Sequence, residues 1–348
     1  MTEKRTIDYF QGCLLGGAIG DALGAPVERM TLDEIRQAFG SSGINAFHPI
    51  YERCGAITDD TQMTLFTAEG LILSQVRQDY QENGVVTAVY HALLRWLYTQ
   101  DTSEQQQLIR KFGSCSIVDG ILTGHHELFS QRGPGNTCLT SLRSGRMGTM
   151  KHPINDRKGC GGLMRIAPVG LANEDAEKAF DLGAQCAAIT HGHPTGYLSA
   201  GFLAALISII GTGRSLEAAI TLSTDILKGY SGHEECLKAI DQARSLAQTA
   251  LPSPETIETL GKGWIAEETL AISLYCALTH GNDFRQGVMP AVNHSGDSDS
   301  TGAVFGQIFG AMHGIRRLPE DLLMELELKA IIQEMADDLF ERFTSQTH

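Results

Sequence analysis

Hydrophobic residues recur at intervals of three and four positions along most of the 348-residue chain. This spacing places apolar side chains on one face of a helix. The pattern covers residues 32–39, 64–76, 85–100, 176–190, 215–230, 234–250, 266–280 and the C-terminal stretch from Pro319. Strand-like alternation is nearly absent. The sequence therefore predicts an all-α fold, with loops in the glycine-rich stretches 131–138 and 157–165.

A stricter pattern, with glycine at every fourth residue, predicts two further helices. The glycines are Gly12, Gly16, Gly20 and Gly24 near the start of the chain, and Gly302, Gly306, Gly310 and Gly314 near its end. A glycine inside a helix costs roughly 1 kcal/mol relative to alanine, so the pattern needs a packing or functional reason. One explanation is a separate close crossing for each helix. The sharper hypothesis is that both helices are central and lie together near one site, which would make their ends neighbours.

The longest apolar segment, residues 196–213, is too short and too rich in glycine and serine to be a convincing membrane span. A buried core helix is the better interpretation. The first 13 residues lack the uninterrupted apolar stretch of a signal peptide. We therefore expect a cytoplasmic protein without a membrane partner.

No linker, charge block or change of composition divides the chain, so we expect one domain over residues 1–348, with residues 1–9 as a short N-terminal tail. The formal net charge of -14 is not offset by a basic stripe, which argues against a nucleic-acid partner. The eight cysteines are scattered and form no C-x-x-C pair. This distribution favours reduced thiols over a disulfide framework or a zinc site.

Two acidic clusters, far apart in the sequence, each stand just before or at the start of an apolar helix. They are Asp59 and Asp60, between Thr58 and Thr61, and Asp297 and Asp299, which alternate with Ser298 and Ser300. Either cluster alone is most simply a helix cap, because Asp, Ser and Thr are preferred there. Together they supply hard oxygen ligands suited to Mg²⁺, Mn²⁺ or Ca²⁺. Asp21 and Glu28, in and just beyond the first glycine pattern, add acids to the same neighbourhood if the helices converge.

Five motifs in this order resemble those of the ADP-ribosylglycohydrolases, a family that includes the ADP-ribosylarginine hydrolases and the enzyme that reactivates dinitrogenase reductase. The motifs are GCLLGGAIGDALGAPVE, ITDDTQMT, GCGGLMR, ITHGHPTGY and NHSGDSDSTGA. The resemblance extends from about Gly12 to about Gly314. It implies a single compact, orthogonal helical domain with two Mg²⁺ or Mn²⁺ ions at the base of a cleft.

The same resemblance assigns roles to individual residues. The metal ligands it implies are Thr58, Asp59, Asp60, Asp297, Asp299 and Ser300, and the catalytic residues are Asp59, Asp60, Asp299 and Glu28. The substrate-binding residues it implies are Gly135, Asn136, Gly159, Cys160, Gly161, Gly162 and His191. Taken by themselves, the two glycine-rich loops would be a surface loop and a tight turn, and His191 would be a structural or surface residue.

The implied activity is metal-dependent hydrolysis of the N-glycosidic bond of ADP-ribosylated arginine on proteins, which releases ADP-ribose and reverses mono-ADP-ribosylation. The second acidic cluster and THGHPTGY look closer to arginine-specific than to serine-specific members. Alternatives are hydrolysis of an O-acetyl- or serine-linked ADP-ribose, or an immunity protein that neutralises a cognate ADP-ribosyltransferase toxin by hydrolysis or direct binding.

Two other classes of function agree less well with the sequence. A metal-dependent helical phosphohydrolase would carry an H-D pair among separated histidines, and the sequence has no such pair. A non-enzymatic ADP-ribose binder would be expected to lose metal aspartates, whereas both acidic pairs are present here.

Overall fold

A computed structural model describes residues 5–77, 80, 84–249 and 253–344. Within these residues the secondary structure is helical, with two isolated β-bridges and no strand. The all-α prediction is confirmed.

The α-helices are α1 Ile7–Gly24, α2 Leu32–Phe39, α3 Asp59–Val76, α5 Val85–Gln100, α6 Gln105–Phe112, α7 Ser114–Ile117, α8 Asn136–Arg143, α9 Ala167–Ala172, α10 Ala176–Ala188, α11 Pro194–Gly211, α12 Leu216–Leu227, α13 Glu234–Thr249, α14 Pro254–Glu258, α15 Ala266–His280, α16 Phe284–Val292, α17 Ser298–His313, α18 Glu320–Glu325 and α19 Lys329–Thr344. Short 3₁₀ turns include η1 Ala25–Val27 and η4 Cys160–Gly162.

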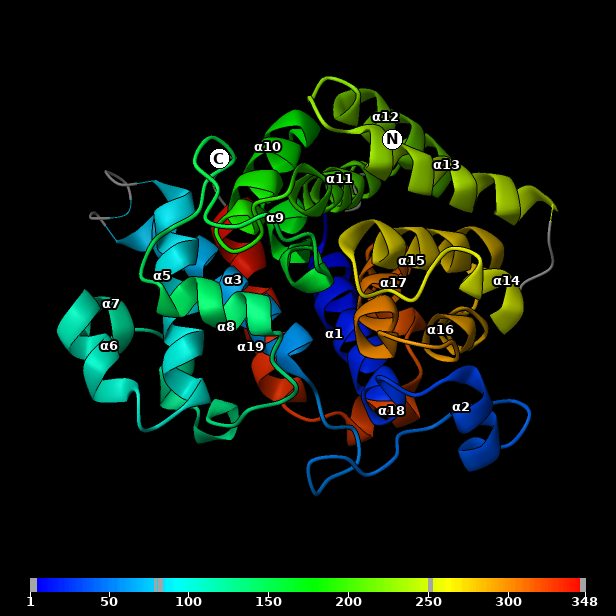
Figure 1. The fold of residues 1–348 in the computed structure, drawn as a ribbon, viewed down its shortest axis with the longest axis horizontal. Coiled ribbons are helices and arrows are strands. Elements are labelled where there is room, and N and C mark those ends of the chain that lie inside the picture. The colour runs from blue at the N-terminus through cyan, green and yellow to red at the C-terminus, as the bar shows by residue number, and fades with distance from the viewer. Residues whose placement is uncertain (1–4, 78–79, 81–83, 250–252, 345–348) are drawn as a thin grey trace.

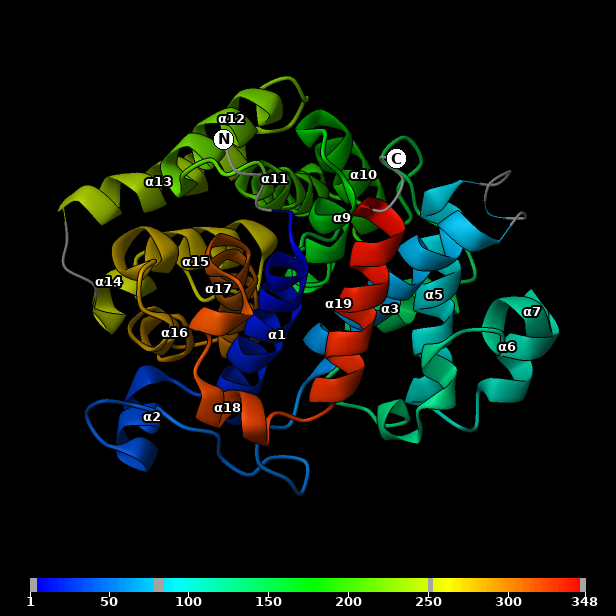
Figure 2. The ribbon, with the colours of Figure 1, turned by 180° about the vertical axis from the view of Figure 1, so that it is seen from behind.

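Helices α1 and α17 lie side by side at the centre of the molecule, although they are separated by most of the chain (Figures 1 and 2). A methyl group added at Gly20 would lie 1.9 Å from the carbonyl oxygen of Gly302, and one at Gly306 would lie 1.9 Å from that of Gly16. No side chain fits at these distances, so the glycines are what lets the two backbones meet. The sharper hypothesis about the glycine pattern is confirmed.

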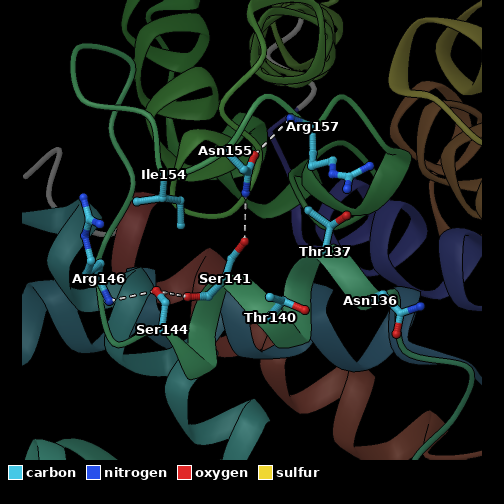
Figure 3. Close-up of a pocket in the computed structure, with 9 residues that line it drawn as sticks. All are labelled: Asn136, Thr137, Thr140, Ser141, Ser144, Arg146, Ile154, Asn155 and Arg157. Carbon is cyan, nitrogen blue, oxygen red and sulfur yellow. Dashed lines mark hydrogen bonds between the residues drawn. The ribbon is translucent and has the colours of Figure 1, made fainter.

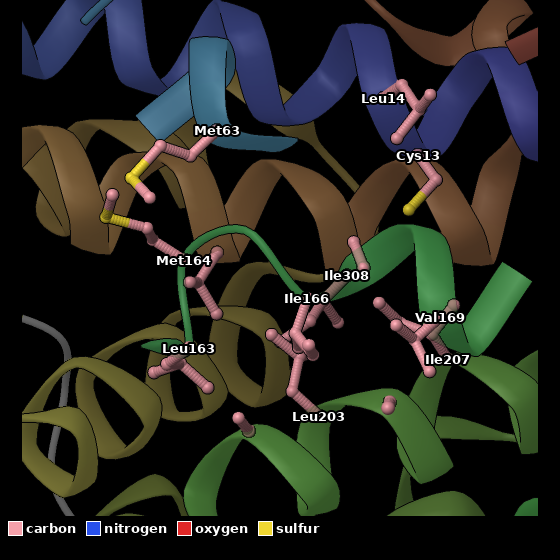
Figure 4. Close-up of a cluster of buried hydrophobic side chains, with 14 of the residues drawn as sticks. Cys13, Leu14, Met63, Leu163, Met164, Ile166, Val169, Leu203, Ile207 and Ile308 are labelled. Carbon is pink, nitrogen blue, oxygen red and sulfur yellow. The ribbon is translucent and has the colours of Figure 1, made fainter. Parts of the chain in front are cut away.

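Most of the buried apolar side chains form one large cluster around this central pair. Figure 4 shows part of it, where Met63 of α3 lies beside Met164, and Val169 of α9 lies beside Ile207 of α11. Helix α11 has the length and a mean hydropathy of 1.5 that a membrane span would need, and 89% of that window is buried inside the protein. The interpretation of this apolar segment as a core helix is therefore confirmed. The single domain over residues 1–348 stays a prediction, and the shared core is consistent with it.

Some expected boundaries were wrong. Helix α3 begins at Asp59 instead of residue 64, because the Thr58 side chain accepts a hydrogen bond from the Asp60 N–H and caps the helix there. The expected tail over residues 1–9 is wrong for its described part. Helix α1 begins at Ile7, and the Tyr9 hydroxyl donates a buried hydrogen bond to the carbonyl of Ile207. Residues 1–4 lie outside the described residues.

Two more segments differ from their expected form. The C-terminal stretch divides into α18 and α19, and Leu328 between them has a φ of 56°. The expected loop 131–138 ends in the first turn of α8, which begins at Asn136.

Candidate active site

The two acidic clusters open α3 and α17, and the central helix pair holds these helix starts together. The buried carboxylate of Asp21, on α1, accepts hydrogen bonds from the N–H and hydroxyl of Thr58 and from the N–H and hydroxyl of Thr61. Asp21 thereby fixes the first turn of α3 against α1. At the end of α1, Gly24 lies directly against Ser298 and Asp299 of α17. The close crossing therefore brings the second acidic cluster to the first.

The segment that carries Glu28 is tied to the second acidic loop by backbone hydrogen bonds. The Arg29 N–H donates to the Gly296 carbonyl at 2.9 Å, and the Gly296 N–H donates to the Met30 carbonyl at 3.3 Å. Arg29 has a φ of 71°, and its exposed guanidinium donates to a Glu28 carboxylate oxygen at 2.9 Å. This turn places the half-buried Glu28 beside the acidic clusters.

These elements enclose one pocket of about 190 Å³. Twelve of the residues that the sequence pointed to line it together: Glu28, Asp59, Asp60, Gly135, Asn136, Gly159, Cys160, Gly161, His191, Asp297, Asp299 and Ser300. Residues from six separate parts of the chain thus meet at one place. This convergence is typical of an active site.

The carboxylates in and beside the pocket repel one another. Burial, followed by the charge of Asp299, raises the pKa of Asp59, Asp60 and Asp297 well above the usual range of an aspartate. The same two causes raise the pKa of Asp21 to about 7 and that of Glu28 to about 7. A nearby positive charge would relieve this repulsion.

The donor set fits a hard divalent cation. The side chains of Asp59, Asp60, Asp297 and Asp299 are all buried, and the buried Asp60 Oδ2 has no hydrogen-bond partner among the described residues. A buried carboxylate oxygen without a hydrogen-bond partner is expected to bind a ligand such as a metal ion. No group of three or more His, Cys, Asp or Glu side chains in the described part of the chain forms a preassembled metal site. The carboxylates supply the right chemistry and would have to close around an ion.

The opposite wall presents backbone amides and neutral side chains. Helix α8 begins without a side-chain cap, and the Gly135 N–H just before it points to the Asp59 carboxylate at 3.4 Å. Burial, and then the charge of Arg165, lowers the pKa of His191 to about 3, so this imidazole is neutral. Its Nδ1 is hydrogen-bonded to the Thr190 hydroxyl at 2.9 Å. An uncapped helix start beside a glycine-rich turn suits the oxygens of a phosphate.

Two residues expected at the site do not line the pocket. The Thr58 hydroxyl donates to Asp21 at 2.8 Å and accepts from the Asp60 N–H, so it works as a cap and a brace. Gly162 lies behind the wall, where an added methyl group would meet Ala187 at 3.1 Å. Ser300 does line the pocket, and its hydroxyl is directed to the sulfurs of neighbouring side chains.

Six lining residues were missed by the sequence reasoning: Arg29, Gly133, Thr137, Cys138, Met164 and Trp264. Five of them stand within or next to motifs that the sequence analysis singled out, so their neighbours gave a signal. Trp264 gave none. The residue lines the pocket and is 40% exposed, so its indole is accessible there.

The fold and the site define a helical protein with a carboxylate-lined pocket facing a wall of backbone amides and neutral side chains. The family model for ADP-ribosylglycohydrolases matches residues 2–348. The chain belongs to the ADP-ribosylglycohydrolase family, as the motifs indicated, and is a glycosidase enzyme with ADP-ribosyl hydrolase activity.

Individual relatives agree with this assignment. The chain is 27% identical to the ADP-ribosyl-[dinitrogen reductase] glycohydrolase of Rhodospirillum rubrum, with 94% of each chain covered. It is 25% identical to the ADP-ribosylarginine hydrolase Tri1 of Pseudomonas putida, with 98% of this chain and 80% of the relative covered. A solved structure described as an ADP-ribosylglycohydrolase-related protein complex superposes with a TM-score of 0.67 at 26% identity, covering 99% of this chain and 100% of that one.

Proposed function

We propose that the protein is a divalent-metal-dependent hydrolase that removes ADP-ribose from arginine side chains of proteins. The observation that carries this proposal is the convergence of the two acidic clusters in one pocket beside the uncapped start of α8. A linkage to arginine is supported by the relative named an ADP-ribosylarginine hydrolase. The products would be ADP-ribose and the unmodified protein. A cytoplasmic location stays a prediction.

The lining of the pocket suggests one orientation for the substrate. The ribose that carries the scissile bond would lie against Asp59, Asp60 and Asp299, and the diphosphate would lie at the backbone amides that begin α8. The exposed face of Trp264 at the rim offers a stacking surface for the adenine base. The acidic wall would attract the cationic guanidinium of the leaving group.

The residues of the chain divide the chemical work. The four aspartates would hold one or two Mg²⁺ or Mn²⁺ ions. Such ions would orient the ribose hydroxyls and lower the pKa of a bound water molecule. Glu28 is half-buried at the rim, and burial raises its pKa to about 7, so its carboxyl group can accept or release a proton near neutral pH. We assign to it the proton transfer that accompanies attack of water at the anomeric carbon and departure of the side chain.

Hydrolysis assays test the proposal. Purified protein with Mg²⁺ is given arginine-, serine- and O-acetyl-linked ADP-ribose, and free ADP-ribose is measured. We expect the arginine linkage to be cleaved fastest, and Asp59→Ala and Asp299→Ala to lose about 100-fold or more in kcat/KM while retaining the fold. Asp241→Ala, an exposed acid on α13, is the matched control and should keep full activity.

Other results would redirect the proposal. Faster cleavage of a serine or O-acetyl linkage would assign a different substrate to the same site. Full activity in EDTA or in both aspartate variants would contradict the metal-dependent mechanism. Inhibition of an ADP-ribosyltransferase by both aspartate variants would favour direct binding in an immunity role.

A further inference from the structure

A second and larger chamber lies along α8. Its volume is about 500 Å³, compared with about 190 Å³ for the acidic pocket. Asn136 and Thr137, in the first turn of α8, line both spaces, so the chamber and the acidic pocket meet at the start of this helix. Figure 3 shows Thr137, Thr140 and Ser144 along α8, and Arg146 and Arg157 at opposite ends of the chamber.

Part of the lining is a hydrogen-bonded scaffold. The Asn155 amide nitrogen donates to Ser141 Oγ at 3.1 Å and to the Thr190 carbonyl at 2.8 Å, and its oxygen accepts from the backbone N–H groups of Arg157 and Gly192. All the capacity of this amide is used. Asn155 is therefore a strut that joins the loop after α8 to the helix.

Five polar side chains of the lining stand outside this scaffold, whereas the Ser144 hydroxyl is hydrogen-bonded to the Ser141 carbonyl and the Arg146 N–H. Among the described residues, the side chains of Asn136, Thr137, Thr140, Arg146 and Arg157 make no hydrogen bond or ion pair with the protein. These groups carry many donors, and the two guanidinium groups carry no acceptor. The described lining includes no carboxylate and no aromatic ring. This composition does not suit a cation or a stacked base, and it does suit an anion with several oxygens.

The local charge points the same way. Residues 143–158 contain five Arg and Lys residues and one acid, in a chain with a net charge of -14. Arg143 and Lys158 are paired with glutamates, whereas Arg146 and Arg157 are not paired in the described structure. A positive chamber therefore lies directly beside the negative pocket, with Asn136 and Thr137 lining both.

We propose that this chamber is a phosphate-binding site distinct from the carboxylate pocket, with Arg146 and Arg157 as its charged ligands. Two sources can supply the phosphate chemistry. One is a phosphate on the substrate nucleotide, which would reach the chamber around the start of α8. The other is free phosphate, which would bind beside an occupied active site. Assigning the phosphate to the substrate nucleotide rests on the proposed function, whereas the proposal of a phosphate-binding site does not.

The test measures binding of inorganic phosphate by calorimetry at constant ionic strength. Three full-length proteins are compared: the wild type, the double variant Arg146→Gln/Arg157→Gln, and the control Arg110→Gln/Arg214→Gln. The control removes two exposed arginines elsewhere that form no ion pair with the described residues. We expect at least a tenfold loss of phosphate affinity in the first variant and no loss in the control. The single variant Arg157→Gln should give an intermediate loss, and it replaces the double variant if that one does not fold.

Repeating the titration with saturating ADP-ribose separates the two sources. Exclusion of phosphate by ADP-ribose, with weaker ADP-ribose binding in the double variant, assigns the chamber to the substrate nucleotide. Simultaneous binding assigns it to free phosphate. The proposal is overturned if the double variant binds phosphate with an affinity within twofold of that of the control. Because this readout is binding, it stands even where the wild type shows no hydrolysis, which would contradict only the proposed function.

Discussion

His191 is a neutral imidazole buried in the wall of the active site, and this fixes its effect on stability. Its pKa falls to about 3 in the folded protein, mainly through burial, from an ordinary value of 6.5. Between about pH 6.5 and 3, the imidazole therefore binds a proton in the unfolded chain but not in the folded protein. Stability from this group is complete above pH 6.5 and is lost as the pH falls.

We predict that His191→Gln reduces the acid sensitivity of the fold. Between pH 7.5 and 5.0 the wild type should lose about 2 kcal/mol of unfolding free energy through His191, and the variant should not. Urea unfolding of both proteins at the two pH values gives this difference. The raised pKa values of Asp21 and Glu28 act in the opposite direction, and they cancel when the two proteins are compared. Equal pH dependence in the two proteins would contradict the prediction.

Trp264 supports a second prediction at the residue scale. If its indole stacks on the adenine base, Trp264→Ala should raise the KM for the ADP-ribosylated substrate about tenfold, with a smaller effect on kcat. Trp264→Tyr keeps an aromatic face and should restore most of the affinity. Steady-state kinetics on the three proteins provide the comparison. An unchanged KM in the alanine variant would remove this residue from substrate binding.

The difference between the predicted and the missed site residues has a physical cause. The sequence could predict the four aspartates because acids beside hydroxyl residues are suitable oxygen ligands for a hard cation. They are Asp59, Asp60, Asp297 and Asp299. Trp264 reaches the pocket only through tertiary packing. Its neighbour Gly263 has a φ of 78° and lies against the second acidic loop, and Gly159 pairs with Ile265 across an isolated bridge. No local pattern in the sequence encodes these two contacts.

At the scale of elements, the crossing of α1 and α17 is what holds the two halves of the site together. We predict that Gly20→Ala destabilises the protein by at least about 3 kcal/mol, because the new methyl group would lie 1.9 Å from a backbone oxygen and cannot rotate away. Thermal unfolding measures the loss. Gly124→Ala is the control, since its methyl group would meet nothing within 4 Å and should leave stability nearly unchanged.

The glycine spacing could predict this crossing because two backbones in close contact require glycine at the contact positions. The first turn of α3 could not be predicted in the same way, since its apolar period starts only after the two acids. The cap at Thr58 decides where that helix begins, and the cap in turn depends on Asp21 of α1. Helix boundaries set by a tertiary contact of this kind are not visible in a hydrophobic pattern.

At the scale of the whole molecule, the acidic pocket couples folding to the binding of a divalent cation. The repulsion among buried carboxylates is present only in the folded protein, so a cation that relieves it binds the folded protein and stabilises it. We predict that Mg²⁺ at 100 times its Kd raises the melting temperature of EDTA-treated protein at pH 8 by about 4 °C, equivalent to about 2.7 kcal/mol.

Asp60→Asn tests the origin of this coupling without an activity assay. The substitution removes a buried charge whose Oδ2 has no hydrogen-bond partner in the described structure. The variant should therefore melt at a higher temperature than the wild type in EDTA, and its response to Mg²⁺ should fall to less than half. Asp241→Asn, on the exposed side of α13, should behave as the wild type in both conditions. A full Mg²⁺ response in Asp60→Asn would mean that the cation binds elsewhere, because nothing else in the variant has changed.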